Sequence, residues 1–142
     1  LVKGWAVQRA ARHLAACPGH DHLLIAGGDL TLGCRRTDTP DWRVGVEDPR
    51  DRSRLLLSLP LRAGAVATSG SAARGEHIVD PTTGAQAHGL ASVTVFGPEL
   101  VWADVYATAA FARGPDSRPW LAGLPQHAAV LVTEHGQLTT TP

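Results

Sequence analysis

Two short segments contain side chains that could serve one chemical site. The first, Glu76 to Gly84, places the imidazole of His77 in a turn-rich stretch. The second, Ala103 to Ala109, contains Asp104 and Thr108, which are four residues apart. On a helix, side chains with that spacing lie one turn apart on the same face. Together the segments are typical of a site where a hard divalent metal ion, a phosphate group and a proton acceptor meet.

The pair Asp104 and Thr108 offers a carboxylate and a hydroxyl, which are hard oxygen ligands suited to Mg²⁺. Mg²⁺ prefers octahedral oxygen geometry, keeps several waters, and is often completed by phosphate oxygens of a substrate. The same spacing also fits a solvated Asp104 next to a Thr108 that packs in the core, because such pairs are common in helices. Spacing alone leaves both interpretations open.

Three further residues could act beside that pair. His77 could serve as a general base near neutral pH, because an unperturbed imidazole has a pKa of about 6.5. Lys3 lies at the start of a predicted helix, where it could meet an anionic ligand, or it is a plain surface lysine. Asp80 precedes Pro81 and could do no more than start a β-turn. The segment Glu47 to Pro49 could lie near a ribose or simply end a strand.

Composition limits the classes of protein. With 142 residues, of which 44% are hydrophobic, we expect one folded unit. Thirteen basic and thirteen acidic residues form no long run of one sign, which argues against nucleic acid as a partner. No apolar run could span a bilayer, and no signal peptide is visible. Cys17 and Cys34 match no zinc or redox spacing, and we expect them to be packed thiols. Since the chain lacks Met and opens at Leu1 in a segment that reads as structured, we expect a piece of a longer polypeptide of undecided compartment.

The elements that must position these residues follow from periodicity and turn signals. Helical spacing predicts helices over 4–16 and 99–112 and a short helix near Trp120. Strands that dominate the middle, with helices at the start and near the end, predict an α+β fold, with a largely antiparallel sheet covered by helices. We expect His135-Gly136 to form a hairpin turn and 138–142 to be frayed. The predicted strands cover 22–26, 42–46, 54–61, 64–67, 92–96 and 128–133.

Six segments in order resemble the FAD:protein FMN transferases, an ApbE-like family of flavin transferases. The resemblance covers nearly the whole chain, which corresponds to the later part of a family member. It therefore implies that residues 1–142 are the C-terminal portion of a flavin transferase domain with an ApbE-like, T-fold-like structure. The segments are Leu1 to Val7, Ala26 to Asp29, Val44 to Pro49, Ala67 to Gly70, His77 to Gly84, and Ala103 to Ala109.

The resemblance implies a Mg²⁺-dependent enzyme that splits the diphosphate of FAD, its substrate, and attaches FMN to a threonine hydroxyl of an acceptor flavoprotein with release of AMP. Asp104 and Thr108 match the family's metal ligands. Lys3 and Ile78 match residues that contact FAD. His77 matches the base that takes the proton of the acceptor hydroxyl. Catalysis of such a transfer depends on positioning the reacting groups and on neutralising the charge of the phosphate oxygens more than on covalent catalysis.

This sequence departs from the family pattern in three places. Gln8 stands where the family often has Asp, Tyr106 replaces a smaller aliphatic residue, and a metal-binding carbonyl would come from the residue before Leu1. In the family, the upstream half supplies contacts to the flavin ring, so we expect an N-terminal portion of the same protein as a partner. The resemblance also suggests a bacterial extracytoplasmic or membrane-associated location.

Two alternatives to the transferase remain open at this point. A FAD pyrophosphatase would keep the metal site but use water as the acceptor, yielding FMN and AMP. A non-catalytic FAD-binding module would bind the dinucleotide intact.

Overall fold

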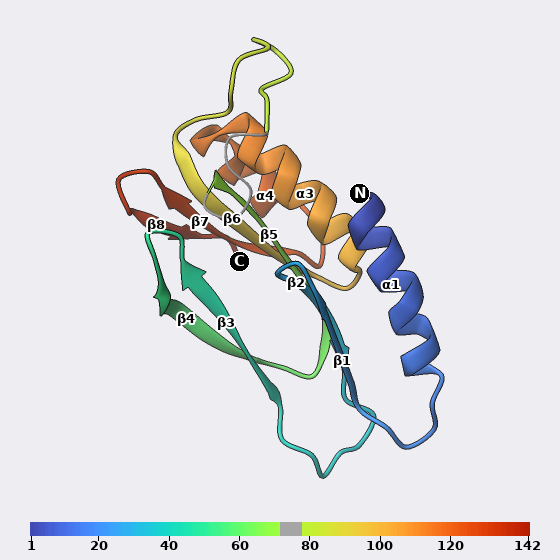
Figure 1. Cartoon of the computed structure of the whole chain (residues 1–142). Helices are drawn as coiled ribbons and strands as arrows, with labels where there is room; N and C mark the ends of the chain where they lie inside the picture. The colour runs from blue at the N-terminus through green and yellow to red at the C-terminus, as the bar shows by residue number, and fades with distance from the viewer. Residues whose placement is uncertain (72–77) are drawn as a thin grey trace.

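The computed structural model describes residues 1–71 and 78–142, arranged in three layers (Figure 1). The middle layer is a six-stranded sheet in the order β1-β2-β5-β6-β7-β8, in which every neighbouring pair is antiparallel. Its strands are β1 (His22–Ala26), β2 (Asp29–Gly33), β5 (Ala63–Gly70), β6 (Leu90–Gly97), β7 (Ala128–Thr133) and β8 (Leu138–Thr140). The antiparallel hairpin of β3 (Trp42–Asp48) and β4 (Asp51–Leu61) is a separate sheet that packs on one face.

The helices pack on the opposite face of the six-stranded sheet. They are α1 (Val2–Ala15), α3 (Leu100–Arg113) and the short α4 (Arg118–Ala122), with a 3-10 turn, η1 (Pro115–Ser117), before the last. Because successive side chains of a strand point to opposite faces, β5 contributes Ala65 and Ala67 to the core under the helices and Val66 to the core under the hairpin. This arrangement confirms the predicted α+β fold with a largely antiparallel sheet.

Helix α3 is the best anchored helix because one face consists mostly of small or apolar residues. Its buried residues recur at helical spacing: Leu100, Ala103, Asp104, Ala107, Ala110 and Phe111. The alanines let the helix axis approach β5 and β6 closely. At its start, the side-chain oxygen of Gln8 on α1 accepts a hydrogen bond from the Val101 N–H at 2.9 Å, which satisfies a donor that a helix N-terminus leaves free. Gly114, with a φ of 76°, ends the helix.

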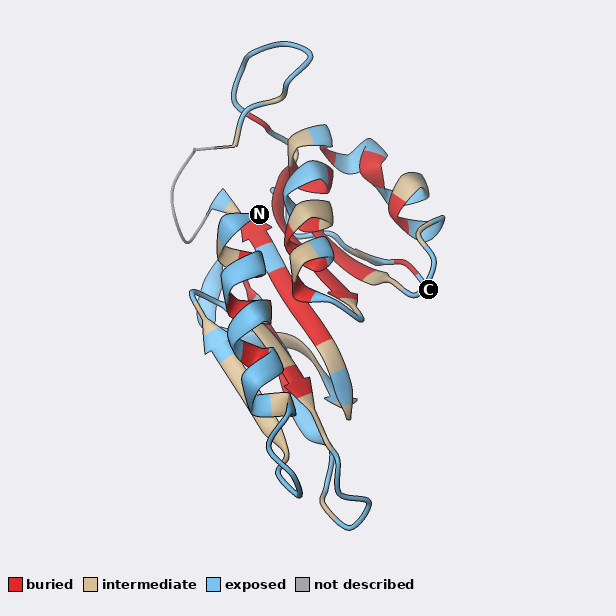
Figure 2. Ribbon diagram, turned by 90° about the vertical axis from the view of Figure 1, so that its right-hand side faces the viewer, coloured by how far each residue is buried: buried red, intermediate tan, exposed pale blue. Residues whose placement is uncertain are grey.

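Helix α1 lies at the edge of the sheet over β1 and β2 and leaves most of its surface exposed (Figure 2). Its buried residues are Gly4, Val7 and Ala11. A Cβ atom added to Gly4 would lie 3.0 Å from both Cβ and Oδ2 of Asp104, closer than most such contacts in proteins. The absence of a side chain at position 4 therefore allows α1 to contact α3 at Asp104.

The β1–β2 hairpin turns through two glycines with positive φ. Gly27 has a φ of 58° and Gly28 a φ of 88°, and Ala26 pairs with Asp29 across the turn. Positive φ at both central residues is what two-residue type I′ hairpins require, and glycine adopts it without steric cost. Asp29 is consequently fixed as the first residue of β2, and its side chain is buried.

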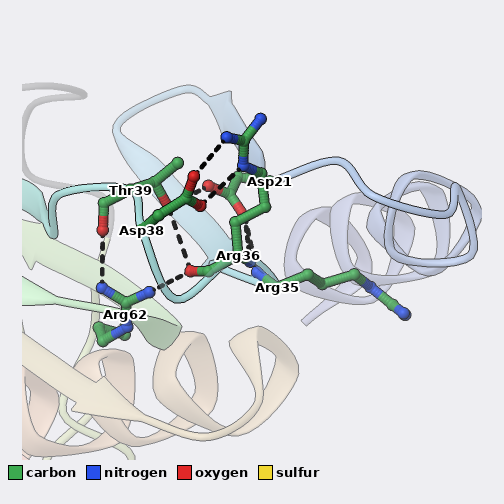
Figure 3. A network of polar contacts seen from close by, with 6 residues as sticks. All are labelled: Asp21, Arg35, Arg36, Asp38, Thr39 and Arg62. Carbon is green, nitrogen blue, oxygen red and sulfur yellow. Dashed lines mark hydrogen bonds and ion pairs between the residues drawn. The ribbon is translucent and has the colours of Figure 1, made fainter.

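A polar network holds the connection between β2 and β3 (Figure 3). One carboxylate oxygen of Asp21 accepts hydrogen bonds from the backbone N–H groups of Arg35 (2.6 Å) and Arg36 (3.1 Å), and the other accepts from the Thr39 hydroxyl at 2.6 Å. The Arg62 guanidinium donates to the carbonyl oxygens of Thr39 and Arg36, at 3.0 and 2.5 Å. These contacts fix the path by which the chain leaves the large sheet and enters the hairpin.

Several sequence-based expectations were wrong. Strand β2 was missed, because no strand was predicted between 22–26 and 42–46, whereas the glycine pair after Ala26 forms a tight hairpin turn. Residues 54–61 belong to β4 and pair with β3, not with the large sheet. The tail is not frayed between Leu138 and Thr140, since these residues pair with β7 as β8. Cys17 is an exposed free thiol rather than a packed one.

In the part of the chain that the structure describes, no helix has both the length and the apolar character needed to cross a membrane.

Candidate functional site

A cavity of about 520 Å³ lies at the end of the large sheet, between the helices and the β3–β4 hairpin. Lys3, Ile78, Asp104 and Thr108 all contribute to its wall. The structure thus brings together the four described residues for which the sequence predicted FAD or metal binding. The catalytic residue predicted with them, His77, lies outside the described residues.

The pair on α3 has one buried and one accessible member. Asp104 is 8% exposed, and its Oδ2 lies 2.8 Å from the backbone nitrogen of Leu1, which donates to it. Thr108 is exposed, and its hydroxyl is 3.0 Å from the hydroxyl of Ser69 on β5. The alternative of a solvated Asp104 beside a core Thr108 is therefore wrong, because the burial of the two residues is the reverse.

The donor set at this point suits a hard cation. A carboxylate and a hydroxyl face one cavity, and both are oxygen ligands of the kind that Mg²⁺ prefers. Among residues 1–71 and 78–142 no three His, Cys, Asp or Glu side chains cluster as a complete metal-binding group. A metal ion bound here would therefore need further ligands, such as waters or phosphate oxygens.

Lys3 is not a plain surface lysine. Its Nζ lies 2.5 Å from Oδ2 of Asp29, a side chain that is 1% exposed. The other carboxylate oxygen of Asp29 is 3.4 Å from the Thr68 backbone nitrogen, which donates to it. Burial raises the pKa of Asp29 and the nearby Asp104 charge adds to this, while the hydrogen bond and the charge of Lys3 oppose it. The carboxylate is thus stabilised mainly through its contact with Lys3.

Hydroxyl groups line part of the cavity wall where β5 and β6 pair. Thr68 lies opposite Thr94 in the register, and their hydroxyl oxygens are 2.9 Å apart. Both residues and Ser69 contribute to the wall. Hydroxyls can donate and accept hydrogen bonds, so this wall can bind phosphate or sugar oxygens.

Ile78 precedes a turn that Asp80 organises. The Ile78 carbonyl accepts a hydrogen bond from the Ala87 N–H at 2.9 Å. Asp80 Oδ1 accepts hydrogen bonds from the N–H and the hydroxyl of Thr82, at 2.8 and 2.7 Å, and the hydroxyl contact is the main reason why the pKa of Asp80 is lowered. The turn interpretation of Asp80 is therefore confirmed.

The segment from Glu47 to Pro49 ends strand β3, as one of the two open interpretations predicted. Asp48 is buried and accepts a hydrogen bond from the Arg50 N–H at 2.9 Å, which holds the β3–β4 turn. Glu47 and Pro49 lie on the cavity wall, and Glu47 pairs with Arg52 at 3.1 Å. The segment ends a strand and also faces the candidate site.

A second hollow, of about 700 Å³, is larger but does not match the predicted chemistry. It lies near Phe96, Pro98 and His127 and is open to solvent. None of the four predicted site residues that the structure describes contributes to its wall. The smaller cavity is therefore the candidate functional site.

Two contributors to the site were missed by sequence reasoning. Asp29 received no role of its own, although a glycine pair between two apolar runs is a hairpin signal that would have placed it at the start of a strand. Ser69 lies beyond the predicted strand 64–67, and no sequence signal pointed to its contact with Thr108.

An antiparallel sheet with a cavity lined by a lysine, carboxylates and hydroxyls defines an α+β protein suited to an anionic ligand and a hard cation. The particular family is given by comparison with known proteins. The model of the ApbE family matches residues 1–132, and the chain belongs to that family.

Sequence relatives are proteins named FAD:protein FMN transferase. The one from Rhodobacter capsulatus is 32% identical over 151 residues, a match that covers 99% of this chain and 28% of that protein. The one from Escherichia coli K12 is 26% identical over 144 residues, covering 94% of this chain and 41% of that protein. The chain thus spans less than half the length of these relatives.

Solved structures agree with the family assignment. The ApbE protein from Thermotoga maritima has a TM-score of 0.86 and 32% identity, over 98% of this chain and 48% of that one. The flavin transferase ApbE from Vibrio cholerae has a TM-score of 0.79 and 28% identity, over 98% of this chain and 48% of that one. The fold described above is therefore that of about half of an ApbE protein.

Proposed function

We propose that this chain supplies the nucleotide-binding and metal-binding part of a FAD:protein FMN transferase. The observation that carries the proposal is the cavity whose wall holds Lys3, Ile78, Asp104 and Thr108 together. Relatives bearing that name support the choice of FAD as substrate and a flavoprotein as acceptor. We propose that a further segment of the same protein completes the site, because the relatives are more than twice as long as this chain.

The residues of the cavity would divide the binding of FAD among them. Asp104 and Thr108 would hold Mg²⁺, which when bound supplies positive charge to neutralise diphosphate oxygens. Lys3 would donate hydrogen bonds from its ammonium group to the diphosphate. The hydroxyls of Thr68 and Thr94 would bind phosphate or ribose oxygens. Ile78 would contact the dinucleotide through apolar surface.

The proposed transfer conserves atoms and charge in a single displacement. The oxygen of an acceptor threonine attacks the phosphorus of the FMN half, and the bond from that phosphorus to the bridging oxygen breaks. AMP leaves with that oxygen, and the threonine proton passes to His77. A neutral imidazole is suited to accept it near neutral pH.

The experiment that tests the function uses the full-length protein with FAD, Mg²⁺ and an acceptor flavoprotein. We expect covalent flavin on the acceptor and one AMP released for each flavin attached. Free FMN with an unlabelled acceptor would show a pyrophosphatase instead. Intact bound FAD, with or without Mg²⁺, would show a binding module and contradict the proposal.

The role of His77 is tested by His77→Ala in the same assay. We expect transfer to slow by about a hundredfold or more, the usual contribution of a general base, with FAD affinity nearly unchanged. His88→Ala, at an exposed histidine away from the cavity wall, is the matched control. An equal loss of rate and FAD affinity in His77→Ala would contradict the role of base.

A further inference from the structure

Asp29 has no role in the function proposed above, yet it is the most deeply buried carboxylate next to the cavity among the described residues. It does not contribute to the cavity wall, whereas Lys3 does. Its Oδ2 lies 2.5 Å from the Lys3 Nζ, so the carboxylate stands behind the ammonium group as seen from the cavity. A ligand in the cavity could touch Lys3 but not Asp29.

The ammonium of Lys3 has capacity for a ligand in addition to Asp29. An ammonium carries three N–H donors, and a single contact to Asp29 leaves two of them. Lys3 is also the only lysine in the sequence, where the other twelve basic residues are arginines. A compact ammonium can fit between a buried carboxylate and an anionic ligand, whereas the planar guanidinium of arginine is wider and needs a different set of partners.

The position of Asp29 is fixed much more firmly than that of Lys3. Asp29 begins β2 directly after the Gly27-Gly28 turn, and it also accepts a hydrogen bond from the Thr68 N–H of the neighbouring β5. Lys3 lies in the first turn of α1, an edge helix with a mostly exposed surface. A lysine side chain has many rotamers, so without a fixed partner its ammonium would occupy the cavity wall only part of the time.

We propose that Asp29 is a positioning residue that holds the Lys3 ammonium at the cavity wall, ready to bind the diphosphate of the nucleotide. This inference rests on the proposed function, because it takes FAD as the ligand. Asp29 acts through Lys3 and not by touching the substrate. Its effect is therefore on the affinity for FAD and not on the chemical step.

The test compares Asp29→Asn, Lys3→Met and the double variant in the full-length protein, with FAD as the varied substrate. We expect each single variant to raise KM for FAD by about tenfold, as expected when a hydrogen bond to a charged group is lost, with kcat nearly unchanged. In the Lys3→Met background, Asp29→Asn should raise KM no further. Asp38→Asn is the matched control, because it removes an exposed ion pair with Arg36 far from the cavity wall.

Two results would overturn the inference. One is an unchanged KM in Asp29→Asn, and the other is an equal effect of Asp29→Asn with and without Lys3, which indicates a structural role. If Asp29→Asn does not fold, Asp29→Glu replaces it, since that variant keeps the charge but displaces it by one methylene. An unchanged KM in Asp29→Glu would then overturn the inference.

A second measurement needs no turnover. Acylation of Lys3 by acetic anhydride, followed by peptide mass spectrometry, reports whether the side chain is held by its carboxylate partner. We expect Asp29→Asn to acylate several-fold faster at Lys3 than the unchanged protein, and an equal rate would overturn the inference. Because this readout does not use FAD, a protein that fails to transfer FMN but shows the faster acylation would contradict the proposed function and leave the Lys3–Asp29 arrangement supported.

Discussion

Helices α1 and α3 have the same length of 14 residues but different relations to the sheet. Six residues of α3 are buried across the central strands, whereas three residues of α1 are buried at the edge. The candidate metal ligands Asp104 and Thr108 lie on α3, and the candidate anion-binding Lys3 lies on α1. The groups that need the most accurate geometry are thus on the better anchored helix.

The comparison also explains why the peripheral helix carries additional contacts. A helix with little buried apolar surface receives little stabilisation from packing and can shift at small cost. Helix α1 is held by polar contacts as well, through Gln8 to the start of α3 and through Lys3 to Asp29. Changes on α3 should therefore remove activity or stability, and changes on α1 should weaken binding.

The largest effect is expected for Asp104→Asn on α3. Loss of the charged oxygen should lower Mg²⁺-dependent release of AMP from FAD by at least about a hundredfold, because charge neutralisation at the diphosphate would be lost. AMP release with varied Mg²⁺ is the measurement, and Asp116→Asn, at an exposed carboxylate, is the control. Turnover that matches the unchanged protein would remove Asp104 from the site.

The difference in anchoring is tested by the same overpacking change on each helix. Ala107→Leu on α3, at a residue with 0% exposure, should lower the free energy of unfolding by about 1–3 kcal/mol. Ala11→Leu on α1, at a residue with 5% exposure, should lower the free energy of unfolding by less, because the edge helix can move outward. Urea unfolding measures both. Equal losses would show that the two helices are anchored alike.

The contact between the helices is tested by Gly4→Ala. Alanine should favour the helix by about 1 kcal/mol, but its Cβ would approach Asp104 to 3.0 Å. We expect the contact to cancel the helical gain, so that the melting temperature does not rise and the Mg²⁺ requirement increases. Gly123→Ala is the control, since a Cβ there meets its nearest atom at 3.5 Å. A clear rise in melting temperature with unchanged Mg²⁺ dependence would contradict the expected close contact.

The smallest effect is expected at Asp21, far from the two helices' contact. Its pKa is lowered, mainly by the hydrogen bond from the Thr39 hydroxyl. The contribution of Asp21 to stability is therefore complete at a pH above the ordinary carboxyl pKa. It is lost as the pH falls through the lowered pKa of Asp21. Protection of the amide hydrogens in residues 34–41, measured relative to their intrinsic exchange rates at each pH, should fall in acid, and Asp21→Asn should show low protection already at neutral pH. Protection in this segment that stays the same at every pH would contradict the role of Asp21.

Prediction from sequence worked where the signal was local. The spacing of apolar residues gave α3 nearly its full extent, and the turn residues from Asp80 to Gly84 form the predicted turn. It failed where pairing is between distant segments. Residues 54–61 have an equally good strand pattern whichever partner they pair with, and only three-dimensional packing assigns them to the β3–β4 hairpin. The short β8 was missed for the same reason.

In the candidate site, too, some features follow from local sequence and others depend on contacts between distant segments. The sequence contains the chemical groups of the site. They are a carboxylate and a hydroxyl one helical turn apart, and a lysine at the start of a helix. Their common location does not follow from the sequence, because Lys3 and Asp104 lie on two helices that are far apart in the sequence. The partner of Lys3 is likewise decided by tertiary structure, since burial of Asp29 depends on α1 covering β2.

The order of residues is enough to know which oxygen and nitrogen groups this protein can offer and which local elements carry them. The burial of Asp104, the exposure of Thr108 and the contact of Asp29 with Lys3 arise only when the elements pack together. This is so because periodicity is set by neighbours along one helix or strand. Burial and ion pairing depend instead on how the Gly27-Gly28 turn and the close contact at Gly4 bring separate elements together.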